Sequence, residues 1–501
     1  RPEDSAEKHV TGGGNDVTGE FVDFDGERYY AIRNVDRMEP FFVSVISSDD
    51  HWLFASSTGG LTAGRVSPAT ALFPYVTVDK IHDSTPHTGA KTIIRVNDGE
   101  GTRYWEPFAQ HHDRQNTTSR NLYKNLLGNK LCFEEINHDL GLAFRYTWLT
   151  SASYGFVRQC SLQNLGSDAV SLDLLDGLQN ILPAGTPMFT QTNSSNLVDA
   201  YKWSELDAST GMAFLSLYSG ITDRAEPCES LQATTAFCLG LEGKRVLISS
   251  EQVDSFERGG KVSQENLKRG VRSAYLVSHS LELPANTSEH WRIVAEVEQD
   301  QAAAANLRRQ LQEPAAVDEA ISHSVADGSD RLARIMAAGD GFQATAEENV
   351  SVHHYANVLF NILRGGVFDD QYQISGRDFR RTVRMFNADV YQRHVAFLEG
   401  LPEKLRFDEL MSIVGSKDPQ LQRLAQEYLP ITFGRRHGDP SRPWNQFAIR
   451  LKDENGDPLL SYEGNWRDIF QNWEALAFSY PGFIENIIAK FVNASTMDGY
   501  N

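Results

Sequence analysis

The chain has 501 residues, and its 47 lysines and arginines against 67 aspartates and glutamates give it a net charge of −20. A chain of this length exceeds the size of one hydrophobic core, so we expect at least two domains. The acidic balance argues against a nucleic-acid partner, because it repels a phosphate backbone, and no apolar run reaches the roughly 20 residues that cross a bilayer.

The N-terminal segment and the cysteines bear on the compartment of the protein. Residues 1–19 begin RPEDSAEKHVTGGGND, which lacks the basic, apolar and small-residue order of a signal peptide. We read them as a disordered leader and expect a cytoplasmic protein. The cysteines are too sparse for a disulfide framework and fit no zinc pattern, so we expect reduced, buried, structural thiols and no metal site. They are Cys132, Cys160, Cys228 and Cys238.

Residues 20–298 are a succession of short segments in which apolar and polar residues alternate, such as AVSLDLL and GLAFRYTWL. Clusters such as NDGEG and NLGSD separate them, which is the turn chemistry found between antiparallel strands. The alternation places one side of each strand in a core, as for Phe144, Tyr146 and Trp148. This part of the chain is predicted to be a large antiparallel β-sandwich, a super-sandwich.

The composition changes at residue 299. Residues 299–350 are rich in Ala, Leu, Arg, Gln and Glu, which favour helix, and are predicted to form a helical linker. Residues 351–501 show helical periodicity, with Ile484, Ile487, Ile488 and Phe491 on one predicted face. The fold class is therefore a multidomain β + α protein, and the helical domain is expected to be incomplete at Asn501.

A first cluster of polar residues, 376–394, holds five arginines followed by His394. Arginine density of this kind suits contacts with an anion or with several hydroxyl groups. The alternative is a solvated face of a helix, which needs no ligand.

A second cluster occupies a segment rich in Gly and Pro at residues 432–447. Binding groups concentrate in loops that a scaffold holds in place, and the planar fork of arginine suits phosphate or vicinal hydroxyls. The alternative is a structural loop. The candidate ligand contacts in this cluster are Arg435, Arg436, His437, Asp439 and Trp444.

A third cluster is SYEGNWRDIFQNWEALAFSYP, residues 461–481. Helical spacing assigns Ile469, Phe470 and Trp473 to a buried stripe. Charged groups beside an aromatic ring suit a sugar, because they hydrogen bond to its hydroxyls while the ring covers its apolar side. In the alternative interpretation, Asp468 stabilises the helix dipole and pairs with Arg467. The candidate sugar contacts are Asn465, Trp466, Arg467 and Asp468.

Two segments carry a resemblance to a known family. The stretch YYAIRNVDRMEPFFVSVISSDDHWLFASSTGGLTAGRVSP and the stretch RDIFQNWEALAFSYPGFIENIIAKF resemble the cellobiose phosphorylase-like and oligoglucan phosphorylase-like enzymes of glycoside hydrolase family 94. The chain looks like the N-terminal portion of a divergent member. The resemblance implies that residues 351–501 begin an (α/α) six-hairpin barrel, that Arg467 and Asp468 contact the sugar, and that Gln471 follows them in the site. Asn472 stands where the family has a second aspartate.

The resemblance also implies a reaction, the inverting phosphorolysis of β-linked gluco-oligosaccharides to a sugar 1-phosphate. One carboxylic acid protonates the glycosidic oxygen while phosphate attacks the anomeric carbon, so one protein carboxyl group suffices. We expect the general acid beyond Asn501, with Asp468 the best candidate inside the chain. Inorganic phosphate is the co-substrate, no cofactor is expected, and the family likeness suggests a homodimer.

Two alternatives remain open. The same fold can carry a glycoside hydrolase or another glycosyl-transferring enzyme, because fold does not determine reaction. If the chain is complete at Asn501, a non-catalytic glycan-binding module is the third possibility.

Overall fold

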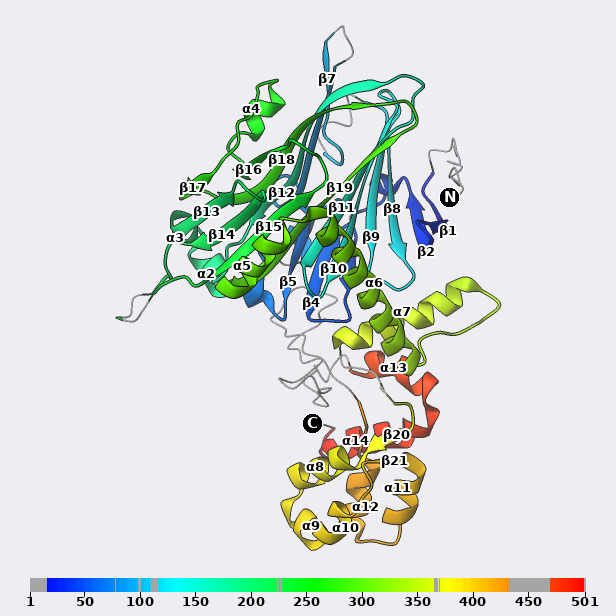
Figure 1. Ribbon diagram of the computed structural model, residues 1–501. Coiled ribbons are helices and arrows are strands. Elements are labelled where there is room, and N and C mark those ends of the chain that lie inside the picture. Colours follow the sequence, from blue (N-terminus) through cyan, green and yellow to red (C-terminus); the bar gives the residue numbers. More distant parts are fainter. Residues whose placement is uncertain are drawn as a thin grey trace.

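The computed structural model describes residues 16–76, 78–97, 101–109, 116–222, 225, 228–364, 368, 370–431 and 469–499. Within these ranges the predicted order is confirmed, because an antiparallel, sheet-rich part comes first and helices follow it (Figure 1). No helix among these residues is long and apolar enough to cross a membrane.

The largest layer is an antiparallel sheet of 11 described strands. From edge to edge it contains β1 (Thr18–Phe24), β2 (Glu27–Arg33), β8 (Thr118–Asn125), β9 (Leu131–Asn137), β10 (Leu142–Ser151), β11 (Gly155–Asn164), β19 (Ser288–Asp300), β15 (Gln232–Leu239), β14 (Met212–Leu217), β13 (Lys202–Asp207) and β17 (Leu267–Arg269). Strand β19 pairs with β11 on one side and with β15 on the other. This late strand therefore closes the middle of the sheet, so residues 18–300 fold as one unit.

A second sheet packs on the first and completes the sandwich. Its order is β16 (Arg245–Ser249), β18 (Ser273–Leu283), β12 (Val170–Ile181), β6 (Gly89–Asn97) and β7 (Thr102–Trp105). Phe144, Tyr146 and Trp148 of β10 are buried in the core between the sheets, as their alternation predicted, while Arg145 and Thr147 between them are more exposed. Removing such large apolar side chains from water is the main force that holds the two sheets together.

An ion pair without solvent contact joins the two sheets inside this core. Arg158 of β11 donates from Nη1 to both carboxylate oxygens of Asp176 on β12, at 2.9 and 2.8 Å, and both side chains are 0% exposed. Trp291 Nε1 and Thr92 Oγ1 donate to the same carboxylate at 2.7 and 2.6 Å. A buried charge is tolerated only when it is paired and hydrogen bonded in this way.

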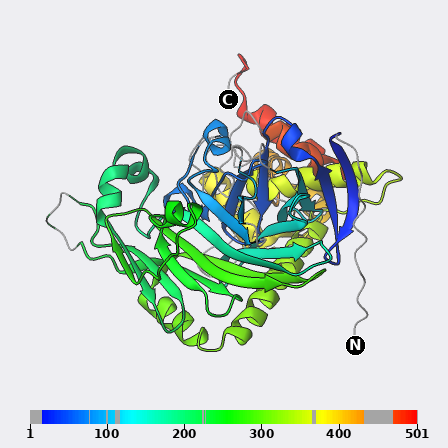
Figure 2. The same ribbon diagram turned by 90° about the horizontal axis from the view of Figure 1, so that it is seen from above.

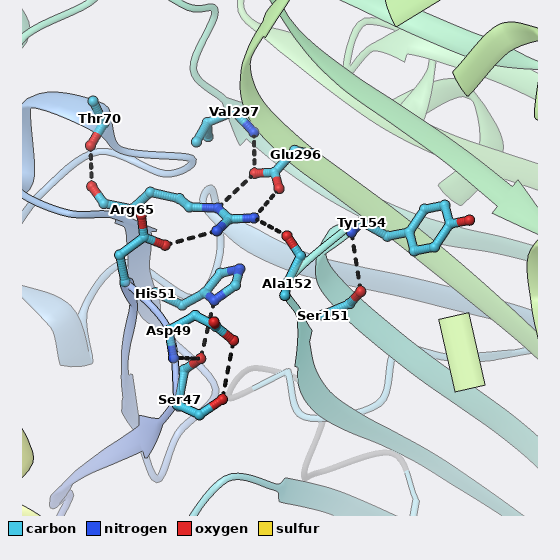
Figure 3. Close-up of polar contacts among 12 residues, drawn as sticks. Ser47, Asp49, His51, Arg65, Thr70, Ser151, Ala152, Tyr154, Glu296 and Val297 are labelled. Atoms are coloured by element: carbon cyan, nitrogen blue, oxygen red, sulfur yellow. Dashed lines mark hydrogen bonds and ion pairs between the residues drawn. The ribbon is translucent and has the colours of Figure 1, made fainter. Parts of the chain in front are cut away.

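A third, three-stranded sheet of β3 (Phe42–Ile46), β4 (His51–Ser56) and β5 (Leu61–Arg65) is attached to the large sheet through Arg65. Its guanidinium contacts Asp50 at 2.8 Å. It also contacts Glu296 of β19 at 3.1 Å and the carbonyl oxygen of Ala152 at 3.0 Å (Figure 3). One arginine thus joins the small sheet to two different parts of the large sheet.

His51 on β4 gives the fold a defined response to acid. Its buried ring lies with Nδ1 3.2 Å from Ser47 Oγ (Figure 3). Burial and the nearby charge of Arg65 hold the pKa of His51 well below its usual range, so the folded protein keeps the imidazole neutral. The unfolded chain takes up this proton below about pH 6.5. The stability contributed by the neutral ring is therefore complete above about pH 7 and is lost as the pH falls through 6.5 and below.

Replacing His51 with glutamine should remove this part of the acid response. Between pH 7 and 5, the free energy of unfolding of the wild type should fall by up to about 1.4 kcal/mol per pH unit more than that of the variant. Urea unfolding at each pH measures both curves. His323 on the surface of α6 (Pro314–Ala338) supplies the control, because its side chain is 75% exposed and His323→Gln should leave the pH slope unchanged. Parallel curves for wild type and His51→Gln would contradict the assignment.

Short helices cover the loops of the sandwich. They are α1 (Val78–His82), α2 (Met188–Asn193), α3 (Ser195–Tyr201) and α4 (Val253–Glu257), with 3-10 turns at Val35–Arg37 and Pro68–Thr70. A third 3-10 turn, Pro481–Phe483, lies in the helical part between residues 479 and 484. Helix α4 packs Phe256 on the outer face of the second sheet, where Arg95 lies 4.0 Å from the centre of its ring.

The predicted linker forms α5 (Gln301–Gln310) and α6, and α7 (Glu348–Arg364) follows. Asp300 caps α5 by accepting a hydrogen bond from the Ala303 amide at 2.8 Å. Helices α5 and α6 lie along the outer side of the curved large sheet (Figure 2). Val317 and Ile321 of α6 enter an apolar cluster on that side.

Polar contacts join α6 to the sandwich at several points along its length. Asp318, Ser324, Ser329 and Arg331 of α6 contact Arg292, Ser151, Asn129 and Asp49 of the sandwich, respectively. The helix is therefore held in one rotation about its axis and at one position along it.

The remaining helical part has a hydrophobic core of its own and lies beyond the sandwich (Figure 1). Trp473 is 2% exposed in this core, so its predicted burial is confirmed. The elements are β20 (Gln373–Ser375), α8 (Gly376–Phe386), α9 (Ala388–Arg393), α10 (Val395–Glu399), β21 (Lys404–Arg406), α11 (Phe407–Val414), α12 (Pro419–Gln426), α13 (Ile469–Ser479) and α14 (Ile484–Ala494).

The predicted apolar face of α14 is wrong in part. Phe491 is buried, but Ile484 and Ile488 are 40% and 56% exposed. Asn486 is buried instead, because its amide donates to the carbonyl oxygens of Ala425 and Tyr428 at 3.3 and 3.1 Å near the end of α12. This polar contact turns the helix away from the rotation that apolar spacing alone would choose.

The cysteine prediction is also wrong in part. All four thiols are free, and Cys132, Cys160 and Cys238 are buried as expected, whereas Cys228 is exposed. Cys228 lies in the connection between β14 and β15, outside the strands that bury the other three.

Candidate functional site

The sequence-predicted ligand contacts fall in parts of the chain that the structure leaves undescribed. Gln471 lies within α13, but its side chain is not described. The boundary of the leader, the barrel assignment and the roles of these side chains therefore stay predictions. The residues outside the described ranges are Arg435, Arg436, His437, Asp439, Trp444, Asn465, Trp466, Arg467 and Asp468.

The arginine cluster at residues 376–394 is partly explained by contacts within the helical part. Arg380 pairs with Glu399 at 3.0 Å, Arg393 pairs with Asp418, and Arg384 lies over the ring of Tyr391. These contacts favour the solvated-face interpretation for the paired arginines. Three arginines of α8 are exposed, namely Arg377, Arg381 and Arg384, and of these Arg384 has the ring contact just described.

A pocket of about 150 Å³ with apolar walls and a few polar groups opens in the sandwich beside the turn at residues 58–60. Strands of both sheets contribute to it, since Ala90, Lys91 and Thr92 belong to β6 and Tyr146 belongs to β10, while residues 106–109 follow β7. Its lining residues are Gly59, Thr85, Pro86, Ala90, Lys91, Thr92, Glu106, Pro107, Phe108, Ala109 and Tyr146. Concave sites that combine apolar walls with a few convergent polar groups are the usual form of a small-molecule site.

Residues 106–109 form one wall, and the buried carboxylate of Glu135 on β9 holds it. Glu135 accepts hydrogen bonds from the Trp105 indole at 2.7 Å, the Phe108 amide at 2.6 Å and Arg120 Nε at 2.7 Å. Arg120 also donates to the carbonyl oxygen of Ala109 at 3.0 Å. The carboxylate therefore fixes the wall at both of its ends.

Phe108 adopts a left-handed backbone conformation, with φ +66°. Non-glycine residues avoid this region, and those that occupy it are held there by their surroundings. The hydrogen bond from its amide to Glu135 and the packing of its ring, 5.3 Å from that of Tyr146, stabilise the conformation. The surrounding residues thus hold this part of the pocket wall in a backbone conformation that a phenylalanine would otherwise avoid.

The charged side of the pocket is the pair of Lys91 and Glu106, whose side chains are 12% and 15% exposed. Glu257 lies 3.5 Å from the same ammonium, and the Tyr104 hydroxyl donates to Glu106 at 3.0 Å. Burial and the charge of Glu106 raise the pKa of Tyr104, so this phenol stays protonated and remains a donor. The arrangement places an ammonium and a carboxylate next to each other at the pocket.

The opposite wall is the turn at residues 58–60. Gly59 has φ +95°, and a Cβ there would lie 3.3 Å from the Tyr146 hydroxyl. A Cβ on Gly60 would lie 2.0 Å from the carbonyl oxygen of Ile81, so this position excludes any side chain. Ser56 Oγ lies 2.7 Å from His82 Nδ1, which fastens the turn to α1.

Metal binding has no support among the residues that the structure describes. They contain no group of three or more His, Cys, Asp and Glu side chains placed to hold an ion. The chemistry available at the pocket is hydrogen bonding and apolar contact with a small polar molecule.

Replacing Glu135 with glutamine should destabilise the protein by about 2–4 kcal/mol, because it leaves the Arg120 guanidinium buried without its counter-charge and one donor without an acceptor. Thermal and urea unfolding measure the loss. Glu282→Gln, at an exposed position near the end of β18, removes the same charge from the surface and should change stability very little. Equal stability of the two variants would show that Glu135 does not hold the wall.

Sequence patterns did not identify Lys91, Glu106 or Phe108 as members of one site. Tyr146 was assigned to the core by its alternation, which is correct for its ring but overlooks its hydroxyl at the pocket. Gly59 and Gly60 were the one available signal, because a Gly-Gly pair after a strand marks a close approach of the backbone to another group.

Residues 368–430 match the family model described as glycoside hydrolase family 149 insertion domain 1. The match covers β20 to α12 and falls within the region that the sequence assigned to the beginning of the barrel. It names family 149 where the sequence resemblance pointed to family 94, and membership of family 94 stays a prediction. No curated protein sequence matches the chain.

Solved structures show only weak similarity. A bacterial glucoamylase complexed with acarbose is 11% identical with a TM-score of 0.35, and covers 74% of this chain and 50% of its own. A protein from the human microbiome described as a kojibiose phosphorylase is 10% identical with a TM-score of 0.32, and covers 67% of this chain and 35% of its own. This chain thus spans about half or less of either neighbour, and TM-scores this low do not establish a common fold.

Proposed function

We propose that the protein containing this chain is a carbohydrate-active enzyme that cleaves β-linked gluco-oligosaccharides by inverting phosphorolysis. The observation that supports a carbohydrate-active enzyme is the match of residues 368–430 to an insertion domain of glycoside hydrolase family 149. The choice of phosphorolysis and of a β-linked gluco-oligosaccharide substrate rests on the sequence resemblance of two other segments to phosphorylases of family 94.

For phosphorolysis the protein has to position the sugar and the phosphate and to supply one proton to the leaving group. A carboxylic acid protonates the glycosidic oxygen while phosphate attacks the anomeric carbon from the opposite face, so the sugar 1-phosphate forms with inversion and the remaining sugar leaves with the proton. In this proposal Arg467 and Asp468 hold the sugar next to the bond that breaks. The proposal also assigns the arginines of residues 432–447 to contacts with the oligosaccharide or with the attacking phosphate.

Dependence on phosphate tests the reaction. The full-length protein is incubated with cellobiose and with longer β-linked gluco-oligosaccharides, with and without inorganic phosphate, and the products are resolved by ion-exchange chromatography. We expect a sugar 1-phosphate only when phosphate is present. Release of free sugar alone, at the same rate in phosphate-free buffer, would replace phosphorolysis by hydrolysis.

The hydrolase and the non-catalytic glycan-binding module are the alternatives on the same fold. An absence of any product, together with retained binding of the oligosaccharide, would favour the binding module. The expected homodimer and the expected lack of a cofactor belong to this proposal and are tested by sedimentation and by activity after dialysis against a chelator.

A further inference from the structure

The pocket beside residues 58–60 offers hydrogen-bond donors to a ligand. An ammonium has three N–H donors. Glu106 accepts a hydrogen bond from Lys91, and the Glu257 carboxylate lies 3.5 Å from the same ammonium, so Lys91 keeps a donor for a molecule in the pocket. The hydroxyl of Tyr146 lies at the pocket and has no hydrogen-bond partner among the described residues. Burial raises the pKa of Tyr146, so its hydroxyl also stays protonated.

The balance of charge at the pocket decides between classes of ligand. Lys91 faces two carboxylates, those of Glu106 and Glu257, so its surroundings carry a net negative charge. Arg158, which lies 4.6 Å from the centre of the Tyr146 ring, is already neutralised by Asp176. An anion such as phosphate is repelled here, whereas a neutral molecule with several hydroxyl groups can both donate to the carboxylate and accept from the ammonium.

The remaining lining is apolar and suits the C–H surface of a ring. Phe108 and Tyr146 meet edge to face at 85°, and Pro86 and Pro107 lie at the pocket as well. Aromatic and proline side chains cover the apolar side of a ring while polar groups fix its orientation. The volume of about 150 Å³ equals that of about five waters at roughly 30 Å³ each, which is room for one ring.

We propose that this pocket binds a single pyranose ring of a neutral sugar, with Lys91, Glu106 and the Tyr146 hydroxyl contacting its hydroxyl groups and Phe108 covering its apolar side. The choice of a sugar among neutral polyols rests on the proposed carbohydrate-active function. None of the lining residues is among the sequence-predicted contacts at residues 435–471; they come from β6, β10 and the loops of the sandwich.

Binding of D-glucose to the full-length protein in phosphate-free buffer tests the proposal, measured by isothermal titration calorimetry. Tyr146→Phe removes only the hydroxyl and should weaken binding at this site about fivefold. Ala90→Leu fills part of the pocket and should lower the number of glucose molecules bound per chain by one. Inorganic phosphate should not compete for the site.

Tyr29→Phe is the matched control. It removes the same hydroxyl from a second pocket of about 140 Å³ beneath α6, which Lys130 and Arg292 also line, and it should leave glucose binding unchanged. If neither Tyr146→Phe nor Ala90→Leu alters the affinity or the stoichiometry, the pocket is not a sugar site. If Ala90→Leu lowers the thermal midpoint, the substitution disturbs the fold, and the affinity of Tyr146→Phe for glucose then decides alone whether the pocket is a sugar site.

The outcome separates this inference from the proposed reaction. Glucose binding that depends on Tyr146, in a protein that releases no sugar 1-phosphate, leaves the pocket assigned and overturns phosphorolysis. If the protein catalyses phosphorolysis but its glucose binding is unchanged by Tyr146→Phe and Ala90→Leu, the pocket assignment is wrong and the proposed reaction stands.

Discussion

Replacing Arg158 with methionine should lower the free energy of unfolding by about 3–5 kcal/mol, because the Asp176 carboxylate is then buried without a cation. Trp291 and Thr92 still donate hydrogen bonds to it, but neither neutralises its charge. The lone carboxylate takes up a proton more readily in the folded protein than in the unfolded chain, so the loss should shrink as the pH is lowered. Urea unfolding at pH 7.5 and 5 measures both effects.

The double variant Arg158→Met with Asp176→Leu should recover much of that loss, because apolar residues often replace a buried ion pair at little cost. Recovery is incomplete since the Trp291 indole then lacks an acceptor. Arg258→Met provides the control: its pair with Asp254 is 3.8 Å apart and more than three-quarters exposed, so no measurable change is expected. Wild-type stability of Arg158→Met would mean that the two sheets do not depend on this pair.

Under the proposed function, replacing Asp468 with asparagine should reduce the kcat/KM for β-linked gluco-oligosaccharides by about 10- to 100-fold, because the proposed charge-assisted hydrogen bond to a sugar hydroxyl would become a neutral one. The thermal midpoint should stay within about one degree of the wild type. Initial rates with saturating phosphate and a thermal unfolding curve give the two quantities.

Glu485→Gln is the matched control for Asp468→Asn. Glu485 is an exposed acidic residue in the first turn of α14, and Asp468 directly precedes α13 in the sequence. Both substitutions remove a negative charge next to the start of a helix, so in the alternative interpretation of Asp468 both should lose a similar favourable interaction with the helix dipole. If the two variants lose stability alike and neither loses activity, Asp468 has only the helix-stabilising role.

The strands and their buried sides could be read from the sequence because alternation is a local property. Phe144, Tyr146 and Trp148 show it directly, since every second position of β10 enters the core. The pairing of β19 between β11 and β15 could not be read in this way. Which strands meet depends on contacts between residues far apart in the chain, and periodicity carries no information about partners.

Helix α14 shows a second limit of prediction from sequence, which concerns the buried face of a helix. Apolar spacing predicted one face for α14, but the hydrogen bonds of Asn486 to the end of α12 decide which face is buried. A buried amide must find partners, and satisfying it outweighs the exposure of Ile484 and Ile488. Such partners belong to another helix and are invisible to the spacing within α14.

The pocket illustrates why a site is harder to predict than a strand. Its lining comes from the connection after β4, the segment after β7 and the middle of β10, which are separated by tens of residues. Glu135, which holds its wall, lies within a strand and has the sequence signature of an ordinary polar position. Only the folded arrangement brings Lys91, Glu106 and Tyr146 to one place.

The firm seating of α6 has a consequence for protein engineering. Contacts from Asp318 to Arg331 fix the rotation of this helix about its axis, so the direction in which its last turn leaves the sandwich is also fixed. Removing one residue between Arg331 and Ala338 would turn the end of α6 by about 100° and shift it by about 1.5 Å relative to the sandwich. A chimera that joins this sandwich to a domain of another protein should therefore have its junction within residues 339–347, which separate α6 from α7 and contain no helix.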